Sequence, residues 1–336
     1  MISVLEDFIS TIDAFNETRP DMDGVRAYNH QMVEILNQLN PVAGKALLDV
    51  GASPHGYTLE HALQLGVSRY VGIGLAVADE AVEVRHQNYT GRLIKMNAED
   101  LAFEPDTFDL ILSLSTFEHF FNGSQVLREM YRVLKPGGRV LINFQPVWTS
   151  SYGHHLHHIP DVAELIPAWA HLLWTEETMM RACTSRWPAD ASMSLRDTVQ
   201  WIYKSDEINR VDIVTLRNMF YQSDFEIEWM TPLLDDETND KSVIARYLSG
   251  LLPYSEEDLM TRGLSLFLTK KSIRELSHQL KQTEKRLTQV QKQIELEKIE
   301  KEEVIGRVEA MESSKFWKLR SQWFWLKKTL GLPSNE

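Results

Sequence analysis

The chain has 336 residues, of which 43% are hydrophobic and 25% are charged, and its formal net charge is −13. This length allows one large domain or two smaller ones, and the acidic balance predicts no nucleic acid partner, because binding phosphates needs concentrated Lys and Arg. The single cysteine, Cys183, excludes an intrachain disulfide and a cluster of thiolate metal ligands.

The N-terminus lacks the basic start and long apolar core of a secretory signal peptide. No apolar run approaches the roughly 20 residues that a membrane-spanning helix needs. We therefore expect a cytoplasmic protein, with or without peripheral contact to the inner face of the cell membrane.

Residues 1–42 are predicted to be helical, with amphipathic segments at 4–15 and 25–39. From residue 46 onward, short apolar strands alternate with helices, which is typical of a parallel sheet covered on both faces. The predicted fold is therefore α/β, with a doubly wound, mostly parallel sheet of seven strands. We expect these strands at 46–50, 69–75, 91–96, 108–114, 139–144, 225–231 and 264–269, and helices at 58–65, 124–133, 210–222 and 242–252.

Residues 146–208 interrupt this alternation, since they are rich in His and Trp and helical only in pieces. We interpret them as a substrate-side insertion in one domain, 1–271. The five tryptophans of the segment suit stacking on sugar rings, although such residues more often form the core of an insertion.

After Lys271 the composition changes to that of a long charged helix. Twelve positions, from Ile273 to Met311, are separated alternately by three and four residues, and nine of them are apolar. The exceptions are Thr283, Glu297 and Lys301. This pattern predicts a coiled coil over 272–312. Because one helix cannot bury such a stripe, we expect a homo-oligomer or a partner protein.

Residues 313–336 form a basic, aromatic tail without an acidic residue between Ser313 and Asn335. A basic helix rich in Trp is typical of contact with an anionic membrane surface or a docking groove. The alternative, of equal weight, is that the aromatic residues pack in an oligomer core. The three-four spacing continues through Phe316, Leu319, Trp323, Leu326 and Leu330.

The motif richest in information is the strand at 46–50 followed by the loop from Gly51 to Gly56. Such a loop lets a nucleotide-like cofactor lie against bare backbone at the carboxyl end of a strand. Together with the order and spacing of further motifs, the chain resembles the Rossmann-like, class I S-adenosylmethionine-dependent methyltransferases of type 11. The motifs that carry the resemblance are residues 48–56, 71–73, 97–101, 108–113, 118–120 and 134–138.

The resemblance implies S-adenosylmethionine as cofactor and assigns roles to matching residues. Asp49 helps to place the amino group of the cofactor, and the glycine loop receives its methionine part. Asn97 and the backbone of Ala98 meet the adenine, while Ser115 faces the sulfonium. The expected cofactor-binding residues are Asp49, Gly51, Ser53, Gly56, Asn97, Ala98 and Ser115.

The chain departs from the family at the end of the second strand, where an acid usually binds both ribose hydroxyls. Gly74 stands there, so the ribose contact must come from elsewhere, with Asp79 or a backbone group as candidates. The loop is also similar to that of some RNA ribose methyltransferases. Their catalytic acid is missing at Ser113–Ser115, however, which argues against an RNA substrate.

Histidines supply the candidate catalytic residues. His119 is a candidate general base, since the ordinary pKa of histidine suits deprotonation of a hydroxyl near neutral pH. Four more histidines lie within 154–158, and of these we select His155 and His158 as catalytic candidates. A metal held by His154 and His158 is the alternative, but we favour a pocket wall and predict no metal.

We therefore predict an S-adenosylmethionine-dependent O-methyltransferase. The coiled coil and basic tail also resemble the C-terminal parts of bacterial glycan-assembly enzymes, which makes a sugar hydroxyl in surface polysaccharide or glycolipid biosynthesis the preferred acceptor. Two alternatives remain. Because Gly74 replaces the ribose acid, the domain could be an inactive scaffold in a glycan-assembly complex, or the acceptor could be a small molecule or lipid.

Overall fold

The computed structural model describes residues 22–86, 89–235 and 240–331. The chain divides into two compact units, Met1–Ser272 and Ile273–Glu336. The amphipathic segment expected at 4–15 lies outside the described residues.

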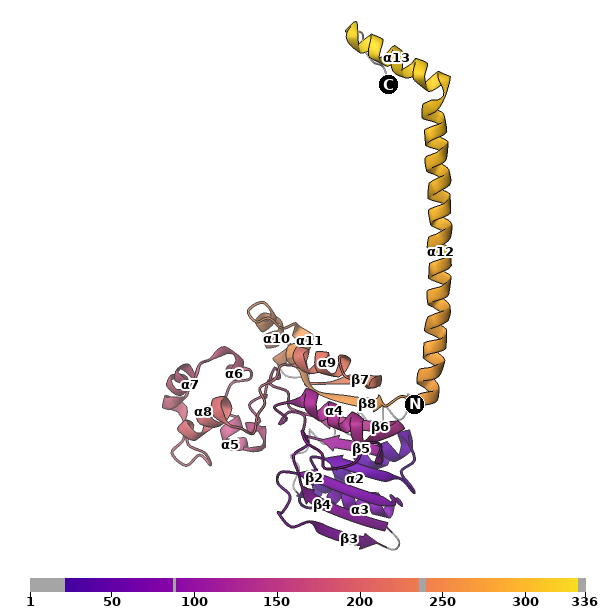
Figure 1. Ribbon diagram of the computed structural model, residues 1–336. Helices are drawn as coiled ribbons and strands as arrows, with labels where there is room; N and C mark the ends of the chain where they lie inside the picture. Colours follow the sequence, from indigo (N-terminus) through magenta and orange to yellow (C-terminus); the bar gives the residue numbers. More distant parts are fainter. Residues whose placement is uncertain (1–21, 87–88, 236–239, 332–336) are drawn as a thin grey trace. The chain divides into compact units, whose positions relative to one another are not determined.

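The first unit is built on an eight-stranded sheet with the order β3-β4-β2-β1-β5-β6-β8-β7 (Figure 1). The central pairs β4–β2, β2–β1, β1–β5 and β5–β6 are parallel, whereas β3, β8 and β7 join their neighbours in antiparallel fashion. The strands are β1 (Ala46–Val50), β2 (Arg69–Gly74), β3 (Val82–His86), β4 (Tyr89–Lys95), β5 (Phe108–Leu114), β6 (Leu134–Phe144), β7 (Glu226–Leu234) and β8 (Thr261–Thr269).

The prediction of a mostly parallel α/β sheet is confirmed by this topology, but the prediction of seven strands is wrong. The additional strand is β3, which lies at the edge and pairs only with β4. This strand has the sequence VEVRH, whose charged residues interrupt any apolar run, so the sequence pattern did not predict it. An edge strand needs no continuous apolar sequence, since charged residues there discourage pairing with other chains. One of them, Glu83, pairs with Arg92 of β4 at 3.2 Å.

Helices cover both faces of the sheet, because successive strand residues point to opposite faces and both are apolar. Leu48 packs in a core with Met130 of α4, whereas Leu47 packs in a second core with Leu36 of α2. Parallel pairing brings the carboxyl ends of the central strands to one edge, where Leu114 pairs with Asn143. The covering helices are α2 (Met22–Leu39), α3 (Tyr57–Gln64), α4 (Gly123–Val133) and α9 (Ile213–Tyr221).

The segment between β6 and α9 is helical in short pieces and has a core of its own. Val162, Met179, Val199 and Ile202 are buried there together. Trp169 is fully buried, and the other four tryptophans of the segment are partly buried against this core. The tryptophans therefore stabilise the insertion itself. Its elements are η1 (Leu156–His158), α5 (Pro160–Ala163), α6 (Ala170–Leu173), α7 (Glu176–Cys183), η2 (Thr184–Arg186) and α8 (Leu195–Lys204); α10 (Lys241–Ser249) and α11 (Glu256–Met260) precede β8.

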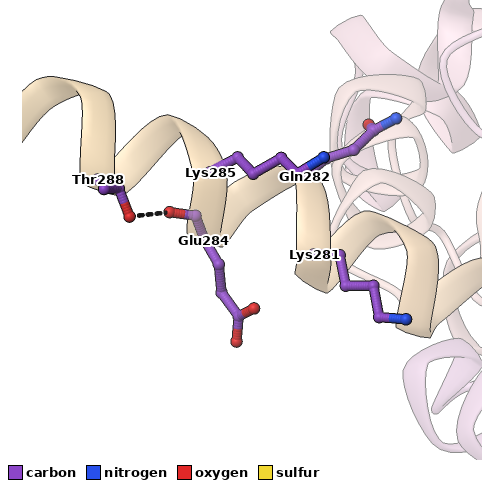
Figure 2. A pocket seen from close by; sticks show the side chains of 5 residues that line it. All are labelled: Lys281, Gln282, Glu284, Lys285 and Thr288. Atoms are coloured by element: carbon purple, nitrogen blue, oxygen red, sulfur yellow. Dashed lines mark hydrogen bonds between the residues drawn. The ribbon is translucent and has the colours of Figure 1, made fainter.

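The second unit contains two described helices, α12 (Ile273–Ser313) and α13 (Lys315–Thr329). Ser314 separates them with an extended backbone, and its side chain accepts a hydrogen bond from the Trp317 amide at 3.2 Å. Figure 2 shows a shallow hollow on α12 between the side chains of Lys281 and Thr288. Its lining comes from adjacent turns of this helix, so it is open on its other sides and we assign no site to it.

Candidate active site at the strand ends

The glycine loop, residues 51–56, is held by hydrogen bonds to the neighbouring strand β2. The amides of Gly51 and Ala52 donate to the Ile73 carbonyl oxygen of β2, each at 2.8 Å. Gly51 has a φ of 89°, and a Cβ there would lie 2.1 Å from the Oγ1 atom of Thr116. Glycine is therefore required by both conformation and space. The remaining predicted loop residues are Ser53, which accepts a hydrogen bond from the His55 amide, and Gly56, which has a φ of 68° and precedes α3.

Gly74 ends β2, where an acid was expected from the family pattern. A Cβ at this position would lie 3.0 Å from the Ala52 carbonyl oxygen, so a side chain here would press on the glycine loop. Asp79, the proposed substitute for the acid, is exposed and forms an ion pair with Lys95 of β4 at 2.7 Å. The hydrogen bond and charge of Lys95 lower the pKa of Asp79.

Asp49 lies on the floor of the site, at the end of β1, and is only 2% exposed. Its carboxylate accepts a hydrogen bond from the hydroxyl of Tyr70. Burial raises the pKa of Asp49 to about 6, although the hydrogen bond from Tyr70 opposes that rise. The nearby Thr58 hydroxyl donates its hydrogen to the side-chain oxygen of Asn29 of α2 at 3.0 Å. The carboxyl group is therefore held by Tyr70 of β2.

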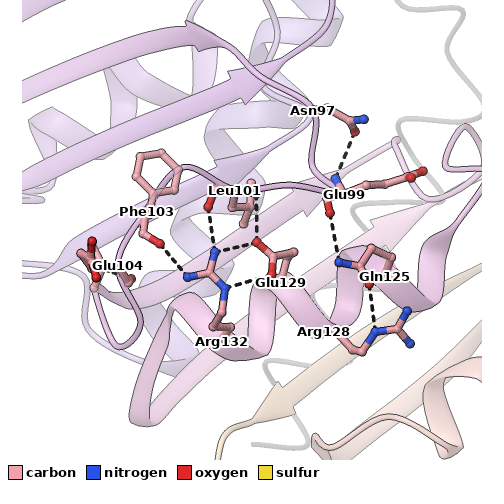
Figure 3. Close-up of polar contacts among 10 residues, drawn as sticks. Asn97, Glu99, Leu101, Phe103, Glu104, Gln125, Arg128, Glu129 and Arg132 are labelled. Atoms are coloured by element: carbon pink, nitrogen blue, oxygen red, sulfur yellow. Dashed lines mark hydrogen bonds and ion pairs between the residues drawn. The ribbon is translucent and has the colours of Figure 1, made fainter.

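The loop after β4 carries Asn97 and Ala98 and is tied to α4 (Figure 3). The Asn97 side-chain oxygen accepts a hydrogen bond from the Glu99 amide at 3.0 Å, while Gln125 donates to the Glu99 carbonyl oxygen. Asn97 is exposed, and Ala98 is buried. The Asn97 side-chain oxygen, which was expected to accept a hydrogen bond from the adenine, therefore already accepts one from the Glu99 amide.

Arg132 of α4 anchors the next part of this loop. Its guanidinium donates to the carbonyl oxygens of Leu101 and Phe103 at 2.7 and 2.6 Å and pairs with Glu129 at 2.6 Å (Figure 3). The hydrogen bond from Arg132 lowers the pKa of Glu129. The loop conformation near Asn97 therefore depends on an ion pair on α4.

At the end of β5, Ser115 adopts a φ of 49°, which is uncommon for a residue with a side chain. Its amide donates to the Asn143 carbonyl oxygen of β6 at 2.7 Å. The Asn143 side chain is buried, where it accepts from the Tyr28 hydroxyl at 2.7 Å and donates to Ser265 at 3.1 Å. Ser115 is exposed above this buried network. Strained residues of this kind cluster at functional sites.

Glu118 is the most strongly perturbed acid of the site. It is 3% exposed, and its Oε2 atom has no hydrogen-bond partner among the described residues. Burial raises its pKa to about 8, despite hydrogen bonds with the backbone of Glu118 and Gln145. Burial raises the pKa of Tyr28, and the charge of Glu118 adds to that rise. A buried acid with an unpaired oxygen marks a candidate functional position.

The structure brings His119 and His155 together, with ring centroids 5.2 Å apart. The Nδ1 atom of His119 bonds to the Glu207 carbonyl oxygen, and the Nε2 atom of His155 bonds to the Pro146 carbonyl oxygen at 2.8 Å. A carbonyl only accepts, so these nitrogens carry the protons and the opposite nitrogens carry lone pairs. His119 is exposed, whereas burial lowers the pKa of His155 to about 3.

His158 is placed differently. It is exposed in η1, and its ring contacts that of His157 at 5.9 Å between centroids. His154, the other member of the alternative metal pair, is buried against His171. Across the three described ranges, no group of three or more His, Cys, Asp or Glu is arranged to hold a metal ion.

Four residues of the site were not predicted from the sequence: Tyr28, Tyr70, Asn143 and Glu118. Glu118 was visible in the Glu-His motif, and Asn143 stands out as a polar residue in an apolar strand. Tyr28 gave no signal, because it lies in α2, far from the motifs in sequence, and reaches the site only through the packing of that helix on the sheet.

Comparisons with known proteins identify the family of the first unit. Residues 48–142 match the family described as "Methyltransferase domain". A ubiquinone biosynthesis O-methyltransferase of Pseudomonas savastanoi pv. phaseolicola is 30% identical over 169 residues, covering 48% of this chain and 70% of the relative. One of Pseudomonas putida is 27% identical over 216 residues, covering 62% and 86%. A crystal structure of an S-adenosylmethionine-dependent methyltransferase from Mesorhizobium loti covers 71% of this chain and 97% of its own, with 17% identity and a TM-score of 0.41.

The chain belongs to the S-adenosylmethionine-dependent O-methyltransferase family. It is a methyltransferase with S-adenosylmethionine as its cofactor.

The residues present fit this cofactor. Asp49 offers a fixed carboxyl group beneath the glycine loop, and the unpaired oxygen of Glu118 offers a second acceptor. Ser115 and Asn97 are exposed at the ends of β5 and β4. These are the residues that would hold the methionine, sulfonium and adenine parts.

Proposed function

We propose that this methyltransferase acts on a sugar hydroxyl, in surface polysaccharide or glycolipid biosynthesis, with His119 as the base that takes the acceptor proton. The observation that carries the proposed chemistry is the hydrogen bond from His119 Nδ1 to the Glu207 carbonyl oxygen. It fixes the ring in the tautomer whose Nε2 atom can receive a proton.

The chemistry that S-adenosylmethionine supplies when bound is an electrophilic methyl group on a sulfonium. The residues of this chain orient the reactants and move the proton. His155 faces the ring of His119 and stays neutral near pH 7, since its pKa is lowered to about 3. It therefore does not compete for the acceptor proton, and it limits the orientations of His119. Most of the rate would come from positioning.

The sugar acceptor is supported by the chemistry of the segment that follows β6. Histidine imidazoles both donate and accept hydrogen bonds, as sugar hydroxyls require, and His157 and His158 are exposed there. The resemblance of the coiled coil and basic tail to glycan-assembly enzymes adds to this. The tryptophans do not, because they pack in the core of the insertion.

The test is methyl transfer from radiolabelled S-adenosylmethionine to a panel of nucleotide sugars and glycans, with and without chelator. We expect His119→Ala to lower kcat by roughly 100-fold or more while cofactor affinity by calorimetry is kept. We expect His158→Ala to raise the KM for the sugar acceptor while kcat stays within a few-fold of the parent. An unaffected His119→Ala protein would remove the proposed base, and an inert sugar panel with an active control acceptor would remove the sugar.

The names of the relatives favour a second candidate acceptor. Both relatives described above are called ubiquinone biosynthesis O-methyltransferases, so a phenolic hydroxyl on a small or lipid-like molecule is the alternative. Catechol-type phenols in the same radiolabel assay separate the two. Transfer to phenols without transfer to sugars would establish this candidate and overturn the sugar proposal.

We also propose that α12 pairs with α12 of a second copy in antiparallel orientation. Eight apolar residues of the stripe have described side chains, and each is between 47% and 61% exposed in the single chain: Leu276, Leu280, Leu287, Val290, Ile294, Val304, Val308 and Met311. Its two charged positions decide the orientation. A parallel pair would stack Glu297 on Glu297 and Lys301 on Lys301, whereas an antiparallel pair can place Glu297 opposite Lys301 in both layers.

This register also places Val290 opposite Val308, which gives a direct test in a Cys183→Ala background. We expect Val290→Cys combined with Val308→Cys to form disulfide-linked dimers on mild oxidation. We expect Val290→Cys alone to stay unlinked, because its two copies would be about 27 Å apart along the pair. Efficient linking of the single variant would show a parallel pair and overturn the proposed orientation.

A further inference from the structure

The last described helix, α13, differs in charge from the rest of the chain. Five basic residues and no acidic residue lie between Glu312 and Glu336, on a chain whose formal net charge is −13. The basic residues are Lys315, Lys318, Arg320, Lys327 and Lys328. A local positive segment on an acidic protein indicates a negatively charged partner.

One face of α13 is apolar and accessible. Its residues are spaced by three and four, so they share one side of the helix, and each is between 44% and 75% exposed. The residues that form this face are Phe316, Leu319, Trp323, Leu326 and Leu330.

Basic residues border this apolar face. With about 100° of rotation per residue, Lys315 falls beside one edge of the face, and Arg320 and Lys327 fall beside the other. Lys327 lies over the ring of Trp323 at 5.7 Å, and Arg320 lies over the ring of Trp317 at 5.1 Å. The long side chains therefore keep their charges next to the aromatic rings, an arrangement that suits the boundary between lipid headgroups and acyl chains.

The expectation that the three-four spacing continues from α12 into α13 is wrong, because the apolar face of α13 is one residue out of register with the stripe of α12. The α12 pattern runs through Val304, Val308 and Met311, and its next two positions are Lys315 and Lys318. The aromatic face begins one residue later, and Ser314 ends one helix and caps the next. Packing of α13 in register with the α12 stripe would therefore place Lys315 and Lys318, and not the aromatic face, in the core of the coiled coil.

The length of α13 excludes one mode of membrane contact. The helix has 15 residues, and a spanning helix needs about 20 predominantly apolar ones. None of the helices in the described part of the chain is long and apolar enough to cross a membrane.

We propose that α13 binds the surface of an anionic lipid bilayer, lying in the plane of the interface with its aromatic face inserted and its lysines and arginine at the headgroups. The interaction combines burial of the apolar face with attraction of the five basic residues to anionic lipid. It is independent of the acceptor proposals above and concerns only where the enzyme is held.

The test is co-sedimentation of the full-length chain with vesicles of phosphatidylcholine alone and of phosphatidylcholine with 30% phosphatidylglycerol. We expect at least tenfold tighter binding to the anionic vesicles at 0.1 M NaCl, and weaker binding at 0.5 M NaCl because salt screens the charges. Equal binding to both vesicles, or binding to neither, would overturn the proposal.

Two variants separate the contributions of the two kinds of residue. Lys315→Gln with Lys327→Gln and Lys328→Gln should lower the affinity for anionic vesicles by roughly 100-fold. Trp323→Gln with Leu326→Gln should abolish measurable insertion. Leu251→Gln, at a residue of the first unit that is 62% exposed, is the matched control and should bind as the parent does.

Circular dichroism and methyltransferase activity should be unchanged in all these variants, which separates loss of lipid binding from loss of folding. Retention of full binding by both α13 variants would show that another segment contacts the lipid and would overturn the proposal. A chain that ignores vesicles but binds an acidic protein through α13 would assign the face to a protein groove instead.

Discussion

The cost of burying the ionised form of Glu118 can be measured from the pH dependence of the free energy of unfolding. The pKa of Glu118 rises from an ordinary 4.5 to about 8 on folding, because the carboxyl group is buried. A raised pKa means that the folded state binds the proton more tightly than the unfolded state. Its stabilising effect is therefore full below pH 4.5 and is lost between pH 4.5 and 8.

The magnitude follows from the pKa values of the two states. Between pH 5 and pH 8, ionisation of Glu118 should lower the free energy of unfolding by about 3 kcal/mol. Glu118→Gln keeps the shape and removes the titration. The free energy of unfolding of the variant, relative to that of the parent, should therefore rise by about 3 kcal/mol from pH 5 to pH 8. Urea denaturation at pH 5, 6, 7 and 8 measures this difference.

The matched control is Glu104→Gln, at an exposed loop residue of the same type (Figure 3). This variant measures how much of the difference comes from replacing a glutamate by glutamine at an exposed position. A difference between Glu118→Gln and the parent that is constant from pH 5 to 8 would refute the reasoning, because it would mean that Glu118 titrates alike in both states. Saturating cofactor should reduce the effect if the cofactor provides the partner that the Oε2 atom lacks.

Three further substitutions test the supports of the site. Gly51→Ala should destabilise the chain by at least about 3 kcal/mol in urea and abolish cofactor binding by calorimetry, since its Cβ would lie 2.1 Å from Thr116; a well-folded variant with parental affinity would contradict this. Arg132→Ala should cost about 2–3 kcal/mol of stability and weaken cofactor binding by freeing the loop after β4, and an unchanged affinity would separate that loop from the adenine site. Asp79→Asn should change the Kd for S-adenosylmethionine by less than about threefold, because an exposed ion pair contributes little; a tenfold rise would instead identify Asp79 as the ribose ligand.

The sheet was predictable from the sequence wherever both faces of a strand are buried. All five residues of β1 are buried, and its apolar run was visible directly. The edge strand β3 could not be predicted in this way. It pairs only with β4, and its sequence has no continuous apolar run. The helix expected at 210–222 begins at Ile213, since Asp212 caps it by accepting from the Thr215 amide at 2.8 Å.

The site was predictable only as far as local sequence determines it. The glycine loop and the Glu-His pair follow from short motifs. The tautomer of His119 depends on a carbonyl group 88 residues away in sequence, and the burial of Glu118 depends on elements packed around it. Such properties come from tertiary contacts, which residue spacing does not contain.

Both proposed acceptors, a sugar carried on a lipid and a phenolic lipid, would be presented at a membrane surface, so binding of α13 to lipid is compatible with either. Evidence for membrane binding therefore cannot choose between them. The choice depends on the residues after β6, where exposed imidazoles of His157 and His158 suit hydroxyl-rich acceptors. An acceptor that responds to His119 but not to substitution of both these residues would favour the phenol.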